Sequence, residues 1–479
     1  MSLISMPNLQ KALLKAALIL SLGSSGPLIA TTPERDSPPT PSPWQTLYEQ
    51  THTHTLDNGL KLVIREDTRA PMIVFQIWYR VGSSYEPVNK TGISHVLEHM
   101  MFKGTESLPP GALSKWVAKF GGQENAFTSR DFTAYYQVWA KEYLELSFAI
   151  EADRMRRLVL SNDEFTKELS VVMEERRQRT DDNPNSTAFE RFYYHALPGN
   201  PYHTPVIGWM HDLEQLSLRD AQAWYDQWYH PSNSIIVIAG DVDATQSIHL
   251  ANHYFGSIPD KAAPITSAPK TIASRGTREI TVKAAAQLPA LYMGFNTPTL
   301  GSTGIGSKDT GSGSAEKPSN TQAYALYTLA ALLDGGYSSR LPKQLVRDKK
   351  MAANASASYN PFSRGDSLFV ITATPTQETT LKTLQTGIWQ SINELKSTPP
   401  SDEELERVKA QLFAQLIYQQ DNLQHQASQL GQMTSLGLNW DSPLKMIEHI
   451  NALSSQDLMD AAKIFLTADN VTVAQLIPE

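Results

Sequence analysis

One segment constrains this chain more than any other: residues 92–101 read GISHVLEHMM. Its apolar residues recur with the spacing of one buried helical stripe and predict a helix. The stripe consists of Ile93, Val96, Leu97, Met100 and Met101. At about 100° per residue, His95, Glu98 and His99 fall on the opposite face of that helix. The stripe can therefore enter a core while two imidazoles and one carboxylate project together from the other side.

The spacing of the two imidazoles suits a metal ion. Histidines at positions i and i+4 are neighbours on a helix surface, so both rings can reach one Zn²⁺ at about 2.0–2.1 Å. Glu98 shares this polar face, and we expect it to lie beside a zinc-activated water rather than on the metal. The alternative is a pair of solvated histidines, so a third ligand on a second helix is needed.

A second helix offers that ligand. Ser161–Glu164 has the pattern of a capping box that starts a helix. Glu168 and Glu175 are two turns apart and flank its apolar stripe, whereas Glu174 points toward solvent. We therefore predict Glu175 as the third zinc ligand. Glu168 is predicted to hydrogen-bond a zinc ligand and orient it, without touching the metal. The alternative is an ordinary solvated charge run at 174–177. The apolar stripe consists of Phe165, Leu169, Val172 and Met173.

Together these segments resemble a known family. Residues 91–105 (TGISHVLEHMMFKGT) and 168–175 (ELSVVMEE) are similar to the pitrilysin/M16 metallopeptidases, the inverted zincins that include the mitochondrial processing peptidase. The resemblance extends from about residue 51 to the C-terminus. It implies an α+β fold of two related domains, each a mostly antiparallel β-sheet flanked by helices, as in LuxS-like metallohydrolases, facing each other across a cleft. Further similar stretches are GGQENAFT (121–128), YHPSN (229–233), GDVD (240–243) and GGYSSRL (335–341).

The resemblance implies a zinc-dependent endopeptidase in which His95, His99 and Glu175 hold one Zn²⁺ and Glu98 is the general base. The chemistry of these groups agrees. Three protein ligands leave the fourth tetrahedral position to water, and zinc lowers the pKa of that water toward about 7. Glu98 can take the proton of the water and return it to the leaving amine. The chain has no cysteine, which excludes a thiol nucleophile.

Substrate binding is expected at residues 125–127. If Ala126, Phe127 and Thr128, next to the turn at Gly121 and Gly122, form an exposed edge strand, an extended peptide can pair with it through main-chain hydrogen bonds. Asn125 is also expected to hydrogen-bond the substrate carbonyl. The alternative is an edge strand that simply packs.

One departure from the family pattern concerns the second half. Family members that work alone bring an arginine and, seven residues later, a tyrosine to the active site. Here Arg347 is present, but Asn354 replaces the tyrosine, and in a strand Tyr359 would point to the other face. The resemblance therefore implies a zinc subunit that works with a homologous M16 subunit supplying an Arg/Tyr pair, or a homodimer. The amide of Asn354 is an alternative donor.

Two other function classes remain open. One is a non-catalytic M16-like subunit that binds peptides or supports an assembly, and the other is a metal-dependent hydrolase of a non-peptide substrate. The net charge of −8 gives no support for nucleic-acid binding.

Composition predicts the domain organisation. The chain has 479 residues, 41% of them apolar, which is too long for one typical domain. We expect a signal peptide at 1–30, a disordered Pro-rich linker at 31–45, a zinc-binding domain at 46–260, a linker at 261–275 and a second domain at 276–479 with a flexible insert at 300–319. The signal predicts a periplasmic or secreted protein, with an N-terminal membrane anchor or a mitochondrial presequence as alternatives. No later apolar run is long enough for an integral membrane domain.

Local patterns predict the main elements. Helices are expected at about 92–102, 111–120, 141–158, 162–180, 218–228 and 321–334, with several more up to 465. Strands are expected at about 60–64, 72–81, 132–139, 235–239, 279–282, 290–295, 368–374 and 471–476.

Overall fold

The computed structural model describes residues 47–264, 266–273, 276–302 and 320–479. The predicted signal peptide, the Pro-rich linker and nearly all of the predicted insert lie outside these residues. In the described part of the chain, no helix has both the length and the apolarity needed to cross a bilayer. All of these described residues belong to one compact unit. The domain boundaries near 261–275 stay a prediction.

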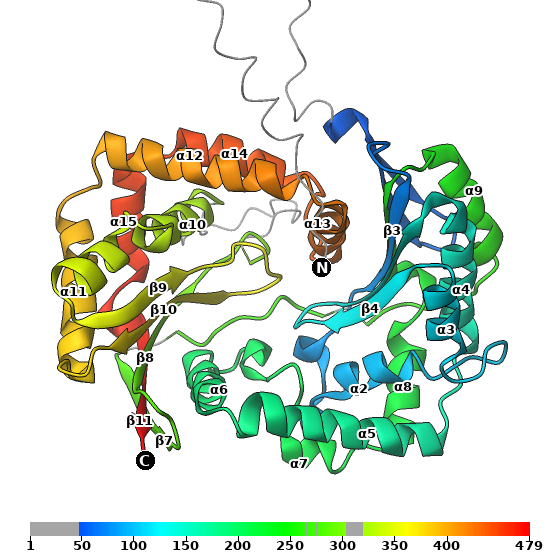
Figure 1. The fold of residues 1–479 in the computed structure, drawn as a ribbon, viewed down its shortest axis with the longest axis horizontal. Helices are drawn as coiled ribbons and strands as arrows, with labels where there is room; N and C mark the ends of the chain where they lie inside the picture. The colour runs from blue at the N-terminus through cyan, green and yellow to red at the C-terminus, as the bar shows by residue number, and fades with distance from the viewer. Residues whose placement is uncertain (1–46, 265, 274–275, 303–319) are drawn as a thin grey trace, which may run out of the picture. The chain divides into compact units, whose positions relative to one another are not determined.

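Two β-sheets organise the described residues (Figure 1). The first has six strands in the order β1-β2-β6-β3-β5-β4, and the second has five in the order β7-β11-β8-β10-β9. The first sheet contains β1 (Thr51–Thr55), β2 (Lys61–Glu66), β3 (Met72–Tyr79), β4 (Gln123–Thr128), β5 (Thr133–Ala140) and β6 (Ser234–Gly240). The second contains β7 (Arg278–Ala284), β8 (Ala290–Thr297), β9 (Ala352–Ser358), β10 (Ser367–Pro375) and β11 (Val471–Pro478).

The two sheets share one connectivity, apart from the additional edge strand β1. In each half the first strand pairs in parallel with the last, β2 with β6 and β7 with β11. The second, fourth and third strands then follow in antiparallel order, ending at the edge strands β4 and β9. This repeat confirms the predicted fold class of two related α+β domains.

Helices cover both sheets. Those of the first half are α2 (Ile93–Met100), α3 (Ala112–Lys119), α4 (Leu144–Arg157), α5 (Asn162–Arg176), α6 (Pro184–Ala196), α7 (Met210–Leu213), α8 (Leu218–Trp228) and α9 (Ala244–Phe255). Those of the second half are α10 (Asn320–Asp334), α11 (Leu381–Ser397), α12 (Asp402–Gln419), α13 (Leu423–Ser435), α14 (Ser442–Ala452) and α15 (Ser455–Phe465). Single π-helical turns occupy Arg177–Asp181 and Pro342–Asp348. Short 3-10 turns occupy Ser83–Tyr85, Lys141–Tyr143, Pro201–His203, Pro231–Asn233 and Ala468–Asn470.

Strand β3 shows why the first sheet is buried on both faces. Alternate side chains point to opposite sides of a strand. Phe75 and Ile77 enter the core beneath α2, whereas Val74 and Trp78 enter a core on the other face of the sheet. The strand therefore reads as a nearly continuous apolar run.

Each half contributes one helix to the sheet of the other half. Helix α13 lies against β3 and β6 of the first sheet (Figure 1). Helix α6 lies against β11, β7 and β8 of the second sheet, where Phe192 joins a small core with Tyr292 and Leu368. Both halves are thus required to bury the apolar faces of both sheets.

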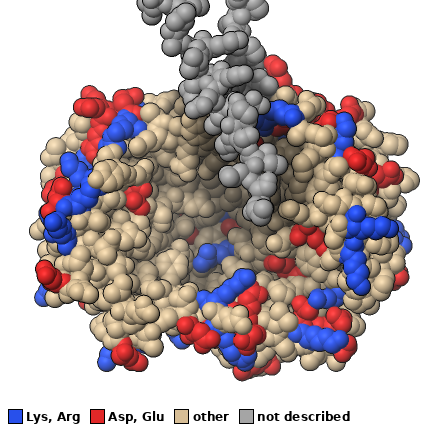
Figure 2. Space-filling model, viewed as in Figure 1, with Lys and Arg blue, Asp and Glu red and all other residues tan. Residues whose placement is uncertain are grey.

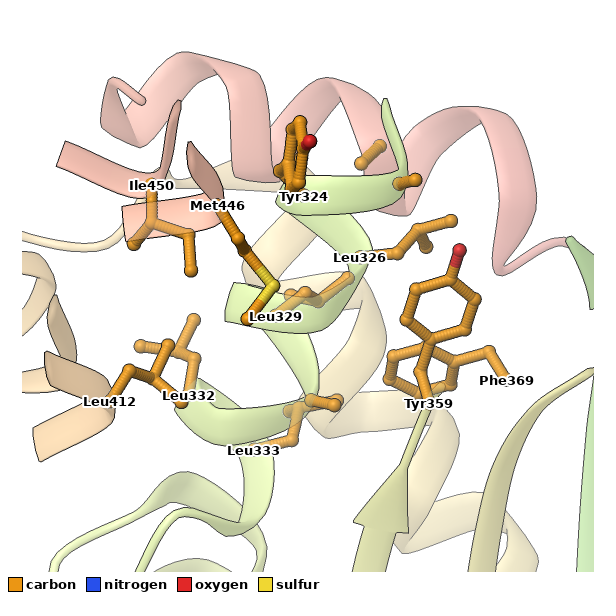
Figure 3. Close-up of a cluster of buried hydrophobic side chains, with 14 of the residues drawn as sticks. Tyr324, Leu326, Leu329, Leu332, Leu333, Tyr359, Phe369, Leu412, Met446 and Ile450 are labelled. Carbon is orange, nitrogen blue, oxygen red and sulfur yellow. The ribbon is translucent and has the colours of Figure 1, made fainter. Parts of the chain in front are cut away.

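Helix α10 shows why the candidate metal site of the described residues has no counterpart at the same place in the second half. It follows β8 as α2 follows β3, but its sequence NTQAYALYTLAALLD has no histidine or glutamate. Its leucines enter the core of the second half, where Leu329 and Leu333 lie among side chains of neighbouring elements (Figure 3). On the face drawn in Figure 2, acidic and basic side chains stand close together without a continuous patch of one sign.

The expected elements were found with small shifts of their ends. Helices α6, α7 and α9 and strands β1 and β9 were not among the expected elements. The helix expected at 162–180 is α-helical only to Arg176 and then widens into the π-helical turn Arg177–Asp181. Such turns often occur at functional sites.

Candidate metal centre

Helix α2 is fixed at its N-terminus by Glu86. The first N–H groups of a helix have no partner within the helix. Here the carboxylate oxygens of Glu86 accept hydrogen bonds from the N–H of Gly92 at 2.8 Å and of Ser94 at 2.9 Å. Burial raises the pKa of Glu86 to about 8, although these two N–H groups act to lower it. The predicted stripe is buried, so the polar face of α2 is presented outward from the core.

Helix α5 positions the two predicted carboxylates. It begins at a capping interaction in which Ser161 Oγ accepts from the N–H of Glu164. Glu168 is buried and Glu175 is largely covered. Glu174 is exposed and pairs instead with Arg177 at 3.2 Å. Glu175, unlike Glu174, therefore lies on the side of α5 that faces α2, and its role as a ligand stays a prediction.

Three potential ligand atoms converge between α2 and α5. Glu175 Oε2 lies 3.8 Å from His95 Nε2 and 3.6 Å from His99 Nε2. Two ligands at about 2.0–2.1 Å from one tetrahedral zinc ion are separated by about 3.4 Å. The observed separations are therefore too long for hydrogen bonds and close to those of a zinc site. Among the described residues, no other group of three such side chains was found.

The surroundings of both histidines favour forms of the imidazole that can bind a metal. Glu168 Oε2 lies 3.2 Å from His99 Nδ1, and Lys103 Nζ holds the other Glu168 oxygen at 2.6 Å. A proton on His99 Nδ1 leaves the Nε2 lone pair free for a metal. Burial, with a smaller effect of His99, lowers the pKa of His95 to about 3, so its imidazole is neutral at physiological pH.

Glu98 projects from the same face but is not part of the converging group. It is buried, and the hydroxyl of Thr128 donates a hydrogen bond to its Oε2. Burial raises the pKa of Glu98, while this hydrogen bond acts to lower it. Thr128 thus orients the predicted general base. This role of Thr128 has no signal in the sequence, because it depends on the approach of β4 to α2.

A cavity of about 550 Å³ contains these groups. The predicted residues Asn125, Ala126 and Phe127 line it from β4, which pairs only with β5 and is the edge of its sheet. Four further residues were not predicted: Arg179, Thr180, Val206 and Ile207. We call this space the metal-site cavity.

The predicted residue Arg347 lies elsewhere. Its guanidinium stacks 3.9 Å from the ring centroid of Tyr337 and donates to the Tyr337 carbonyl. It lines a separate cavity of about 1170 Å³, and Asn354 lies in the edge strand β9. Tyr359 cannot replace the missing tyrosine, because it is buried beside Phe369 (Figure 3) and its hydroxyl donates to the Pro298 carbonyl at 2.6 Å.

Two family descriptions match the chain. Residues 61–208 match Insulinase (Peptidase family M16), and residues 215–412 match Peptidase M16 inactive domain. The chain is 33% identical over 368 residues to the zinc protease PqqE of Helicobacter pylori, covering 76% of this chain and 78% of that protein. A crystal structure of a protease from Helicobacter pylori superposes with a TM-score of 0.81 and 29% identity, covering 89% of this chain and 99% of that one.

A relative of a different kind is also similar. The human mitochondrial cytochrome b-c1 complex subunit 1 is 28% identical over 249 residues, which is 52% of this chain and 52% of that protein. Similarity in this range therefore includes both named proteases and a subunit of another complex.

Proposed function

Because this chain belongs to the M16 peptidase family, we propose that it is a zinc-dependent endopeptidase acting on peptides or unfolded polypeptide segments. The observation that carries the proposal is the convergence of His95, His99 and Glu175 beside Glu98 in one cavity. Relatives named zinc protease support the choice of metal.

In this proposal His95, His99 and Glu175 hold one zinc ion per chain, and Glu168 keeps His99 in the tautomer that binds metal. The bound zinc would supply a water of lowered pKa and polarise the scissile carbonyl. The carboxylate of Glu98 would accept a proton from the attacking water, whose oxygen forms the new bond to the carbonyl carbon. Glu98 would then give this proton to the leaving amine as the C–N bond breaks. The hydroxyl of Thr128 keeps the Glu98 carboxylate aimed into the cavity.

The edge strand β4 would bind the substrate. Its free edge can pair with an extended peptide through main-chain hydrogen bonds, which depend little on sequence. Residues 125–127 line the metal-site cavity, so a peptide on this edge would pass the zinc ligands. Residues Asn125, Ala126 and Phe127 therefore keep their proposed role in substrate binding.

The chain is also proposed to work with a partner. Arg347 lines a cavity other than the metal-site cavity, so the described part of the chain offers no Arg/Tyr pair to the proposed zinc ligands. A homologous M16 subunit, or a second copy of this chain, would complete the site. The apolar segment near residue 20 favours export to the periplasm or beyond.

The second candidate is a non-catalytic binding or assembly subunit, which the similarity to the cytochrome b-c1 complex subunit supports. The complete group of three ligands with a nearby carboxylate argues against it. Zinc content by elemental analysis, combined with cleavage of an unstructured peptide library, separates the candidates. A zinc-loaded chain that cleaves peptides while its Glu98→Gln variant does not would support the peptidase. A chain without zinc and without cleavage, alone and with homologous subunits, would refute it.

A further inference from the structure

Arg179 brings a positive charge into the metal-site cavity. It lies in the π-helical turn that follows α5, four residues after Glu175. Its Nη1 donates to Glu175 Oε1, while Glu175 Oε2 faces the two histidines. The Arg179 side chain is nevertheless 74% exposed. The contact with Glu175 therefore anchors the guanidinium at the wall of the cavity and leaves most of its N–H groups accessible.

No other lysine or arginine is found among the described residues that line this cavity. The lining carboxylates are Glu98 and Glu175. Glu98 already accepts from Thr128, and Glu175 is held by Arg179. With a divalent metal bound, these two carboxylates and one guanidinium leave the cavity with a single net positive charge.

The other side chains of the cavity offer little to an anion. Phe127, Val206 and Ile207 supply apolar wall and have no side-chain donor for a peptide carboxylate. A guanidinium presents its donors as a planar fork that matches a carboxylate. The unused donors of Arg179 thus fit a carboxylate on a bound peptide.

We propose that Arg179 is a specificity-determining residue that binds a carboxylate of the peptide close to the scissile bond, an acidic side chain or the terminal carboxylate. This inference rests on the proposed peptidase function. Without Arg179 the metal-loaded cavity would be neutral and would lose its fork-shaped anion partner.

A matched control lies two residues earlier. Arg177 belongs to the same turn and pairs with Glu174 at 3.2 Å. It is 47% exposed and is not among the residues that line the metal-site cavity. Arg177→Gln removes the same charge from the chain as Arg179→Gln, but not from the cavity.

The test measures binding rather than turnover. Zinc-loaded Glu98→Gln protein, with intact Arg179, is titrated with fluorescein-labelled unstructured peptides that differ only by Asp or Asn at one scanned position. A second pair of peptides has a free or an amidated C-terminus and distinguishes the two sources of the carboxylate. We expect the carboxylate member of at least one pair to bind about three- to fivefold more tightly, the upper range for an ion pair with an exposed arginine.

In the Glu98→Gln background the metal-loaded cavity carries one more positive charge, so adding Arg179→Gln should reduce this preference, whereas adding Arg177→Gln should leave it unchanged. Zinc content is measured for each protein. Arg179→Gln could lose zinc because Glu175 is no longer held. In that case Arg179→Lys, which keeps the charge but not the planar guanidinium, is compared with the Glu98→Gln protein. It should show a weaker preference for the carboxylate peptide. The inference is overturned if the zinc-loaded Glu98→Gln protein binds both peptides of every pair with equal affinity. It is also overturned by a preference of undiminished size in the zinc-loaded protein that also carries Arg179→Gln.

The failure of the proposed function has a different signature. A chain that cleaves peptides with zinc bound but shows no carboxylate preference refutes only the role of Arg179. A chain that binds neither zinc nor any peptide refutes both.

Discussion

Gly431 of α13 lies so close to the indole of Trp78 on β3 that a Cβ at position 431 would stand 2.1 Å from Trp78 Cε2. The same relationship occurs in the opposite direction. A Cβ on Gly294 of β8 would stand 2.5 Å from Cζ of Phe192 on α6. In both places a large aromatic ring of one half packs onto a glycine of the other half, where no larger residue fits.

The first prediction concerns this packing. Gly431→Ala should lower the free energy of unfolding by about 1–3 kcal/mol, the usual cost of overpacking a core. Trp78 is a rigid ring whose Nε1 donates to Gln76 Oε1 at 2.9 Å, so it cannot easily move aside. Urea denaturation followed by circular dichroism measures the effect. Gln432→Ala on the same helix is the control and should change stability by less than about 0.5 kcal/mol. A Gly431→Ala protein as stable as the parent would contradict the close packing.

The second prediction concerns the zinc ligands. His95→Ala or His99→Ala should release the metal, because two remaining ligands hold zinc poorly. Elemental analysis after dialysis measures the zinc content. His253→Ala, on the exposed side of α9, is the control and should keep full occupancy. Full zinc occupancy in a protein that carries both His95→Ala and His99→Ala would refute the ligand assignment.

The third prediction separates the general base from the ligands. Glu98→Gln should retain zinc yet lose peptide hydrolysis by about 10²–10⁴-fold, because an amide cannot accept the proton of the water. The zinc content and the rate of cleavage of an unstructured peptide are measured on the same preparation. If Glu98→Gln loses zinc instead, Glu98 is itself a ligand and the assignment of Glu175 is wrong.

The fourth prediction concerns the second half. The purified chain should be weakly active alone and strongly activated by a homologous subunit that carries both the arginine and the tyrosine. Loss of one donor to the developing oxyanion costs about 10²–10³-fold in rate. Asn354→Tyr should recover part of this activity without the partner. Full activity of the isolated chain, unchanged in Asn354→Ala, would exclude dependence on a partner.

The fifth prediction concerns pH and Glu86. Its pKa rises from the ordinary value of 4.5 to about 8 in the folded chain. Between these pH values the folded state binds more protons at this carboxyl than the unfolded state, so the stability of the fold decreases as pH rises. Glu86→Gln removes this titration. Urea denaturation of both proteins in chelator at pH 5, 6, 7 and 8 should show the parent losing stability relative to Glu86→Gln. A difference that is constant over this range would contradict the raised pKa.

The candidate metal site could be predicted from sequence because its ligands lie on two amphipathic helices. The apolar stripes of α2 and α5 fix which way His95, His99 and Glu175 face, and a stripe is visible in the sequence. Arg179 also had a local signal, since a glutamate four residues before an arginine on a helix usually pairs with it. Thr128 had none, because its contact with Glu98 depends on how a strand and a helix pack in three dimensions.

Helix α6 was not among the expected helices, although its sequence carries local helix signals. Asn183 before Pro184 is a strong helix start, and Ala188, Phe192 and Ala196 recur at every fourth residue. The apolar side of α6 faces a sheet formed by residues far along the chain, so its partner could not be inferred from neighbouring sequence. The position of Arg347 is likewise a tertiary outcome, because the stacking on Tyr337 depends on the fold of the loop between α10 and β9.

The exchange of α6 and α13 has a consequence for how this molecule can be divided. Cleavage of the chain near residue 265 would leave one apolar sheet face exposed in each fragment. The two fragments are therefore expected to fold together by complementation rather than to fold separately. The same exchange couples substitutions in the two halves. A larger residue at position 431 requires a smaller one at 78, and a larger residue at 294 requires a smaller one at 192. The sequences of the two halves are therefore expected to change together at these positions.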